Sequence, residues 1–228
     1  MYIDEWFKDD FYKKLPLGYH QQFSFGQLFR THAYYPHENL ELWRPVSDPN
    51  EPTKTIASHF QIVAAGQDAF RRNIPLAIPK LETNEEFLVV RAKMRPVVLV
   101  MPETPSLGVD NKGYHGRVQR HLCLVGQVFG LVDSKTNRVE FSPSFIDRLR
   151  KMEFPQLMFL PARAGFLDVD SLLRLDELQS VFTPNLEPTQ LALGDDVASV
   201  LKGQLQYLVS GTGPSAYTEL RELLLTGL

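Results

Sequence analysis

Cysteine is almost missing from this chain of 228 residues: the sequence has one, Cys123, inside the apolar run 122–125. A single cysteine excludes an intramolecular disulfide and a metal centre built from several thiolates, and its apolar neighbours favour a buried, inert thiol. Long apolar runs are missing too, because no stretch approaches the roughly 18 residues that a membrane-spanning helix needs. The acidic segment 1–14 lacks the apolar core of a secretory signal. We therefore expect a soluble, cytoplasmic protein without a membrane partner.

The chain also has little excess of either charge. Its 24 basic and 27 acidic residues give a formal net charge of -3, which argues against a generally basic protein that coats nucleic acid. Glycine-rich phosphate loops, the HExxH and GxSxG motifs and zinc-finger spacings are all absent from the sequence. The six histidines are scattered, so we predict neither a metal site nor a cofactor.

What is present is a series of short apolar runs with strand character, followed by amphipathic helices. The runs with strand character are 23–35, 86–90, 97–100, 121–132 and 172–181. Helical spacing of apolar residues marks 3–15 and 195–209, a serine-capped helix is expected over 142–151, and a last helix follows residue 214. Residues 36–79 are repeatedly interrupted by proline and are expected to be irregular. This order predicts an α+β fold, in which a small antiparallel barrel or curved sheet of about five or six strands carries helices.

An arginine stands at the mouth of the apolar strand 97–100. Pro96 fixes its own φ and biases the preceding Arg95 toward extended backbone. Arg95 is therefore either a phosphate-binding group or a surface charge that flanks a hydrophobic strand. The similar pair Arg44-Pro45 leads into polar residues and a second proline, so we predict no binding role for it.

A second basic feature is the loop 112–121, which contains no acidic residue. Cations interleaved with an aromatic ring suit a strand of nucleic acid, because the cations meet phosphates and the ring stacks on a base. The alternative is a solvated loop that its charge keeps in water. The candidate RNA-binding residues of this loop are Lys112, Tyr114, His115, Arg117, Arg120 and His121.

Several stretches together resemble one family, the MazF/PemK (CcdB-like) toxins of type II toxin–antitoxin systems. The strand that begins Gly26-Gln27-Leu28-Phe29 resembles the family's opening strand, and 94–100 resembles its Arg-Pro strand. The block 154–181 is similar to a late family block, and 195–209 matches its closing helix. The resemblance covers about 23–35, 94–101, 121–131 and 154–209.

The resemblance implies an SH3-like antiparallel β-barrel with insertions, an N-terminal helix and C-terminal helices. We expect one domain over 1–228, with an N-terminal helical extension at 1–22 and a C-terminal helical tail at 210–228. The barrel then spans 23–209, with insertions at about 36–93 and 103–120. As partners, the resemblance implies single-stranded RNA, an antitoxin protein and a second copy of the chain.

In that family the ribose 2′-hydroxyl attacks the adjacent phosphate without a metal, and a cation stabilises the charge that develops on the phosphate. The resemblance assigns this catalytic role to Arg95, and it gives Asp176 the place of a family acid at the barrel edge with a structural role. The family's catalytic threonine has no counterpart, because Val125–Phe129 contains no hydroxyl. Two hypotheses therefore stay open. One is a metal-independent endoribonuclease, and the other is a non-catalytic SH3-like barrel that acts as a protein- or nucleic-acid-binding module.

Overall fold

The computed structural model describes residues 1–35, 39, 41–47, 50, 55–64, 82, 84–103, 121–133, 136 and 139–227. Contacts along the chain divide it into two compact units, Met1–Ala33 with Met94–Leu228, and Tyr34–Lys93. The insertion expected at 36–93 falls within the second unit. The single-domain organisation stays a prediction.

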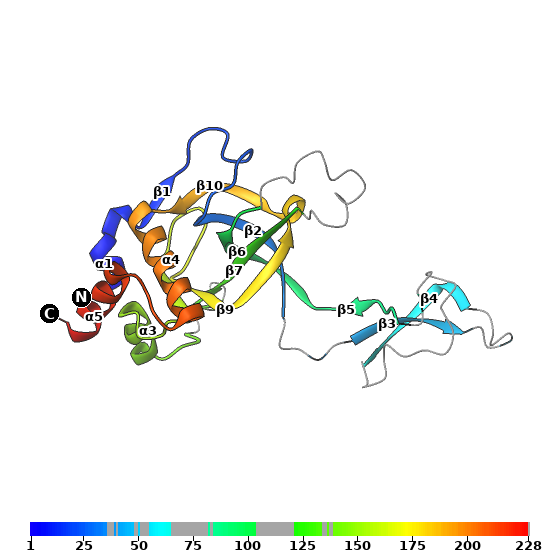
Figure 1. Cartoon of the computed structure of the whole chain (residues 1–228). Helices are drawn as coiled ribbons and strands as arrows, with labels where there is room; N and C mark the ends of the chain where they lie inside the picture. Colours follow the sequence, from blue (N-terminus) through cyan, green and yellow to red (C-terminus); the bar gives the residue numbers. More distant parts are fainter. Residues whose placement is uncertain are drawn as a thin grey trace. The chain divides into compact units, whose positions relative to one another are not determined.

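The first unit is built on a seven-stranded sheet with the order β1-β10-β2-β6-β7-β9-β8 (Figure 1). Its strands are β1 (Tyr12–Lys14), β2 (Gln27–Tyr34), β6 (Ala92–Met101), β7 (Leu122–Gly130), β8 (Leu157–Leu160), β9 (Ser171–Phe182) and β10 (Glu187–Leu193). The ladders whose register is described are antiparallel, and the α+β class is confirmed. The predicted closed barrel is wrong, because β1 and β8 end the sheet in the described part of the chain. These two strands have three and four residues, the short length that is typical of protected edges.

The pleat of β6 explains why residues 97–100 are all apolar and do not alternate with polar residues. Successive side chains of a strand point to opposite faces, and β6 packs a hydrophobic cluster on each. Val98 belongs to the cluster that contains Leu28, whereas Val97 and Leu99 belong to the cluster that contains Phe29. A strand that is covered on both faces needs apolar residues at consecutive positions, as the sequence has here.

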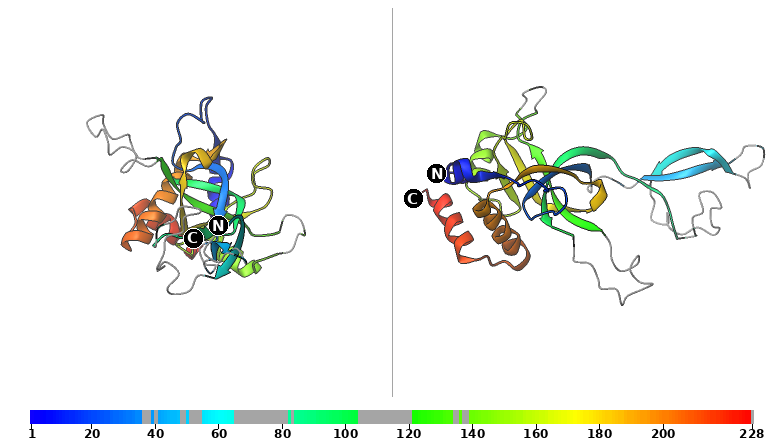
Figure 2. Two further views of the ribbon diagram at one scale, coloured as in Figure 1. Left: turned by 90° about the vertical axis from the view of Figure 1, so that its right-hand side faces the viewer. Right: turned by 90° about the horizontal axis from the view of Figure 1, so that it is seen from above.

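Four α-helices lie in the described part of the first unit: α1 (Ile3–Phe7), α3 (Pro143–Arg150), α4 (Asp195–Ser210) and α5 (Ser215–Thr226). The predicted closing helix is confirmed as α4, and the Ser142 hydroxyl caps α3 by accepting the Phe145 N–H at 3.2 Å. Helices α4 and α5 lie side by side (Figure 2), where Gly203 leaves room for Tyr217. No described helix is long and apolar enough to cross a membrane.

The helix predicted over 3–15 is wrong beyond its first turns. Helix α1 is followed by the 3-10 helix η1 (Lys8–Phe11), and the chain then extends into β1. Tyr12 of β1 pairs with Leu193 and Lys14 with Leu191 of β10. This long-range pairing overrides the local helical pattern, because a ladder with β10 satisfies the backbone that a helix would otherwise satisfy.

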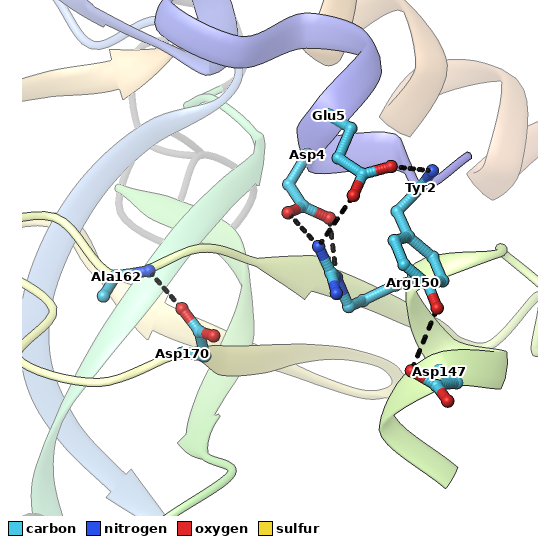
Figure 3. Close-up of polar contacts among 7 residues, drawn as sticks. All are labelled: Tyr2, Asp4, Glu5, Asp147, Arg150, Ala162 and Asp170. Carbon is cyan, nitrogen blue, oxygen red and sulfur yellow. Dashed lines mark hydrogen bonds and ion pairs between the residues drawn. The ribbon is translucent and has the colours of Figure 1, made fainter. Parts of the chain in front are cut away.

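Helix α1 is tied to α3 by Arg150 (Figure 3). The guanidinium donates to both carboxylate oxygens of Asp4, at 2.9 and 2.6 Å, and lies 3.9 Å from the ring centre of Tyr2. The Tyr2 hydroxyl donates to Asp147 at 3.2 Å, and this bond raises the pKa of the hydroxyl. The paired side chains of Arg150 and Asp4 are only 24% and 19% exposed, so solvent screens this contact less than an ordinary surface pair.

Arg150→Ala is expected to lower the free energy of unfolding by about 2 kcal/mol, because a bidentate charged bond is lost and Asp4 keeps its burial without a partner. The measurement is urea unfolding followed by circular dichroism. Arg148→Ala is the matched control on the same helix, since Arg148 pairs locally with Glu153 at a surface that is 51% and 37% exposed. An equal loss for both variants would contradict the anchoring role of Arg150.

The second unit contains a three-stranded antiparallel sheet with the order β4-β3-β5. Its strands are β3 (Glu41–Ser47), β4 (Thr55–Ala64) and β5 (Leu88–Val89), so the irregular structure predicted for 36–79 is wrong for β3 and β4. Pro45 fits into β3 because the β5 ladder covers only Glu41 and Leu42. Arg44 donates to Glu86 at 2.9 Å, and the Glu86 side chain is fully buried, which gives this arginine a structural role.

Candidate nucleic-acid interface

Arg95 lies in β6 with its guanidinium over an aromatic ring. The β6–β7 ladder pairs Val97 with Gln127, so Arg95, two residues earlier, reaches Phe129, two residues later. The guanidinium carbon is 4.4 Å from the centre of the Phe129 ring, a geometry in which cation and ring attract each other. The side chain of Arg95 is half-buried. The structure therefore holds Arg95 flat against β7 instead of leaving it free in solvent.

Phe129 also lines a cavity of about 260 Å³. The aromatic side of this cavity is formed by Phe129, Phe141 and Phe145, and its polar side by Gln156, Arg174 and Asp176. The rings of Phe141 and Phe145 are stacked, with centroids 5.1 Å apart and planes 20° from parallel. Half-buried aromatic rings at the edge of a cavity offer flat faces on which a nucleic-acid base can stack.

The polar side of the cavity comes from a bulge in β9. Gly126 pairs with Leu178, and the next residue, Gln127, pairs with Arg174. Residues 175–177 of β9 therefore have no partner in the β7–β9 ladder. The guanidinium of Arg174 donates to Asp176 at 3.0 and 2.7 Å and contacts Glu177 at 2.8 Å. Bulges of this kind re-aim side chains and are frequent beside functional sites.

Asp176 is a poor candidate for a proton donor. The hydrogen bonds from Arg174 lower the pKa of Asp176, and the same bonds raise the pKa of Arg174. Asp176 is therefore ionised at neutral pH and restrains the guanidinium of Arg174. This geometry fits the structural role that the resemblance implies for Asp176.

Strand β7 offers a buried amide where the resembled family has a threonine. Gln127 is 1% exposed, and its amide nitrogen donates to Gln179 at 3.4 Å. Gln179 in turn donates to the carbonyl of His32 in β2 at 3.4 Å. The chain of amides links three strands of the sheet, and it contains no group that could take a proton from a ribose hydroxyl.

Most of the predicted basic loop lies outside the described residues, namely Lys112, Tyr114, His115, Arg117 and Arg120. His121 is described and exposed, and its Nδ1 bonds to the carboxylate of Glu103. Thr183 donates to the same carboxylate at 3.0 Å, so His121 belongs to a small polar cluster just before the start of β7. Arg95 precedes Met101, at the far end of the β6 ladder, by six residues or about 20 Å. The structure does not bring Arg95 and His121 together within one chain.

A second cluster of cations was missed by sequence reasoning. Lys14, Arg30 and Arg163 line a common cavity of about 440 Å³, together with Glu187. These residues are far apart along the chain, and they meet because β1 and β2 both pair with β10. No local motif could have indicated the cluster.

Among the residues that the structure describes, no group of three or more His, Cys, Asp or Glu side chains is arranged to hold a metal ion. Comparison of the chain with protein-family models and with curated proteins gives no match. What the chain does must therefore follow from the side chains themselves. The two features that stand out are the Arg95–Phe129 contact beside its aromatic cavity and the cationic cavity beside β10.

Proposed function

We propose that this chain binds single-stranded RNA where β6 begins and β7 ends. The observation that carries the proposal is the guanidinium of Arg95, held 4.4 Å above Phe129 beside a cavity with aromatic walls. A cation in this place can meet a phosphate. Phe145 is stacked on both Phe141 and Phe154, so the ring face that can stack on a base is the one that Phe141 turns away from Phe145. A single strand fits better than a duplex, because bases must leave their own stack before they can reach aromatic side chains.

The resemblance to MazF/PemK toxins extends this proposal to an SH3-like core, an antitoxin protein as partner and metal-independent cleavage of RNA. In such a reaction Arg95 stabilises the charge that develops on the phosphate oxygens. Cleavage also needs a group that moves a proton, and Val125–Phe129 supplies none.

Cleavage is tested by incubating the purified protein with a mixed-sequence single-stranded RNA in the presence of a chelator, followed by analysis of the RNA ends. An endoribonuclease of this type leaves a 5′-hydroxyl on one product and a cyclic 2′,3′-phosphate on the other. RNA that is bound but stays intact removes the enzymatic part of the proposal and keeps the binding function.

The second candidate function is a non-catalytic module that binds a protein or a nucleic acid. The observation that favours it is Gln127, which is buried and bonded to Gln179 in the strand where the resembled family has its threonine. A module for a protein partner predicts that RNA binds neither tightly nor in a salt-dependent way. The RNA-binding proposal predicts the opposite on both counts.

Homodimerisation remains part of the proposal. The first unit presents two sheet edges, β1 and β8, and exposed apolar side chains at the end of α4, where Leu208 is 38% and Val209 is 88% exposed. Light scattering at micromolar concentration is expected to give about twice the chain mass of 26.0 kDa. A mass of one chain would contradict the dimer.

A further inference from the structure

The cavity beside β10 is built by four separate parts of the first unit. Lys14 comes from β1, Arg30 from β2, and Arg163 from the loop between β8 and β9, whereas Glu187 opens β10. Phe166 and Leu191 form an apolar part of the cavity wall. The volume of about 440 Å³ falls in the range of roughly 300–1,000 Å³ that is usual for small-molecule sites.

Lys14, Arg30 and Arg163 form no ion pair with any residue that the structure describes. Other arginines of the same unit are paired: Arg150 lies 2.6 Å from Asp4 and Arg174 lies 2.7 Å from Asp176. Lys14, Arg30 and Arg163 are exposed, and the carboxylate of the cavity, Glu187, is the cross-strand partner of Arg30. Three cations against one carboxylate leave a net positive charge that attracts an anion.

The Arg30 side chain and the backbone of the loop that carries Arg163 are ordered before any ligand arrives. The Arg30 guanidinium lies 5.5 Å from the centre of the Phe166 ring, and Phe166 is itself buried. The backbones of Arg163 and Leu167 exchange hydrogen bonds of 2.8 and 2.9 Å across a tight turn. Gly165 provides the left-handed conformation of this turn, with φ of +86°.

Two further bonds fix the start of the same loop. The Tyr12 hydroxyl of β1 donates to the carbonyl of Pro161 at 2.8 Å. Burial raises the pKa of Tyr12, so this hydroxyl keeps its proton and remains a donor at all ordinary pH values. The carboxylate of Asp170 accepts the N–H of Ala162 at 2.8 Å (Figure 3). A site with this much prior order loses little entropy when it binds a ligand.

We infer that this cavity binds a small phosphomonoester of a sugar. A phosphomonoester carries up to two negative charges, which suits three cations that face one carboxylate. The space exceeds what a phosphate group needs and leaves room for an organic part. Glu187 can accept hydrogen bonds from sugar hydroxyls, and Phe166 and Leu191 can cover apolar atoms of the ligand.

This site is separate from the proposed RNA interface. Arg30 lies two residues after Leu28, and therefore on the face of the sheet that packs with Val98. The ring that Arg95 contacts, Phe129, packs against the same hydrophobic cluster, but the cavity beside Phe129 and the cavity beside β10 have no lining residue in common. Ligand binding at the cavity beside β10 is therefore independent of RNA binding at Arg95.

Isothermal titration calorimetry on the full chain tests the inference with ribose 5-phosphate, adenosine 5′-monophosphate, orthophosphate and adenosine as probes. Both esters are expected to bind saturably and more tightly than orthophosphate, and adenosine is expected not to bind. Tighter binding of the nucleotide than of ribose 5-phosphate would assign the organic part to a nucleotide, and equal binding would assign it to the sugar alone.

Arg30→Gln and Arg163→Gln are each expected to weaken ester binding by roughly 10-fold or more, the scale for losing one charged hydrogen bond. Lys14→Gln provides a third variant at the same cavity. Lys202→Gln is the matched control, because Lys202 is an exposed cation over the Phe25 ring, at 5.0 Å, on the separate helix α4. Thermal unfolding of every variant verifies its fold.

The inference is overturned if neither ester binds saturably, if orthophosphate binds as tightly as both esters, or if Arg30→Gln and Arg163→Gln bind the esters like the unaltered chain. Loss of RNA binding in these variants, without ester binding in the unaltered chain, would also overturn it and would assign the cavity to RNA.

Discussion

Replacement of Gly194 by alanine is expected to lower the free energy of unfolding by more than about 3 kcal/mol, at or beyond the upper end for overpacked sites. Gly194 joins β10 to α4, and its N–H donates to the carbonyl of Phe11 at 2.9 Å. A Cβ at this position would lie 1.8 Å from the carbonyl oxygen of Asp10, which is backbone and cannot rotate away. The φ of -57° suits alanine, so the whole effect is steric. Urea unfolding followed by circular dichroism measures it.

Gly165→Ala is the control for this substitution. A Cβ at Gly165 meets nothing within 4 Å, but the residue has φ of +86°. The free energy of unfolding of Gly165→Ala should therefore fall by about 1–2 kcal/mol, the strain of a left-handed alanine. If Gly194→Ala were no less stable than Gly165→Ala, the close packing of η1 against the start of α4 would be contradicted.

Arg95→Ala is expected to have the largest functional effect. If the chain cleaves RNA, turnover should fall by on the order of 10²-fold, the usual scale for losing one preorganised electrostatic contact. If the chain only binds RNA, the affinity should fall by roughly 10-fold. Gel-based cleavage assays and fluorescence anisotropy of a labelled RNA measure the two effects.

Two comparisons make the Arg95 result interpretable. Arg30→Ala removes another arginine that lies over a phenylalanine ring, at 5.5 Å, but it lines the separate cavity beside β10, and its loss should leave RNA binding unchanged. The cation–π contact with Phe129 contributes about 0.5–1 kcal/mol to the stability that Arg95→Ala loses. A large loss of stability with unchanged RNA affinity would make Arg95 a structural residue.

The elements that the sequence predicted well have strong local patterns. Helix α4 follows from apolar residues at helical spacing behind Asp195 and Asp196, and β6 follows from its β-branched run. Of the three leucines expected to be buried in the strand 172–181, Leu172 and Leu175 are buried and Leu178 is half-buried. In each case the local preference and the tertiary environment agree.

Elements whose pairing partner is distant could not be predicted in this way. Residues 12–14 continue a helical pattern, yet they form β1 because β10 lies beside them. Strand β3 contains Pro45, which local reasoning assigns to irregular structure. The sheet stays open because it ends at the short strands β1 and β8. The spacing of apolar residues in the sequence does not indicate which strand lies at the edge of a sheet.

The candidate sites show the same division. Arg95 was predicted because Arg-Pro before an apolar run is visible in one short stretch, whereas its contact with Phe129 requires the register of β6 and β7. The cavity of Lys14, Arg30 and Arg163 had no sequence signal, because its residues are brought together only by the sheet and one loop.

RNA binding through Arg95 is tested by the affinity of the chain for a labelled, mixed-sequence single-stranded RNA, measured between about 50 and 200 mM salt. RNA binding through Arg95 predicts saturable binding that weakens as salt rises. It also predicts that the plot of log K against log salt has a slope about 0.7 shallower for Arg95→Ala, because one phosphate contact is lost. Absence of saturable binding, or equal affinity and slope for the unaltered chain and Arg95→Ala, would contradict the account.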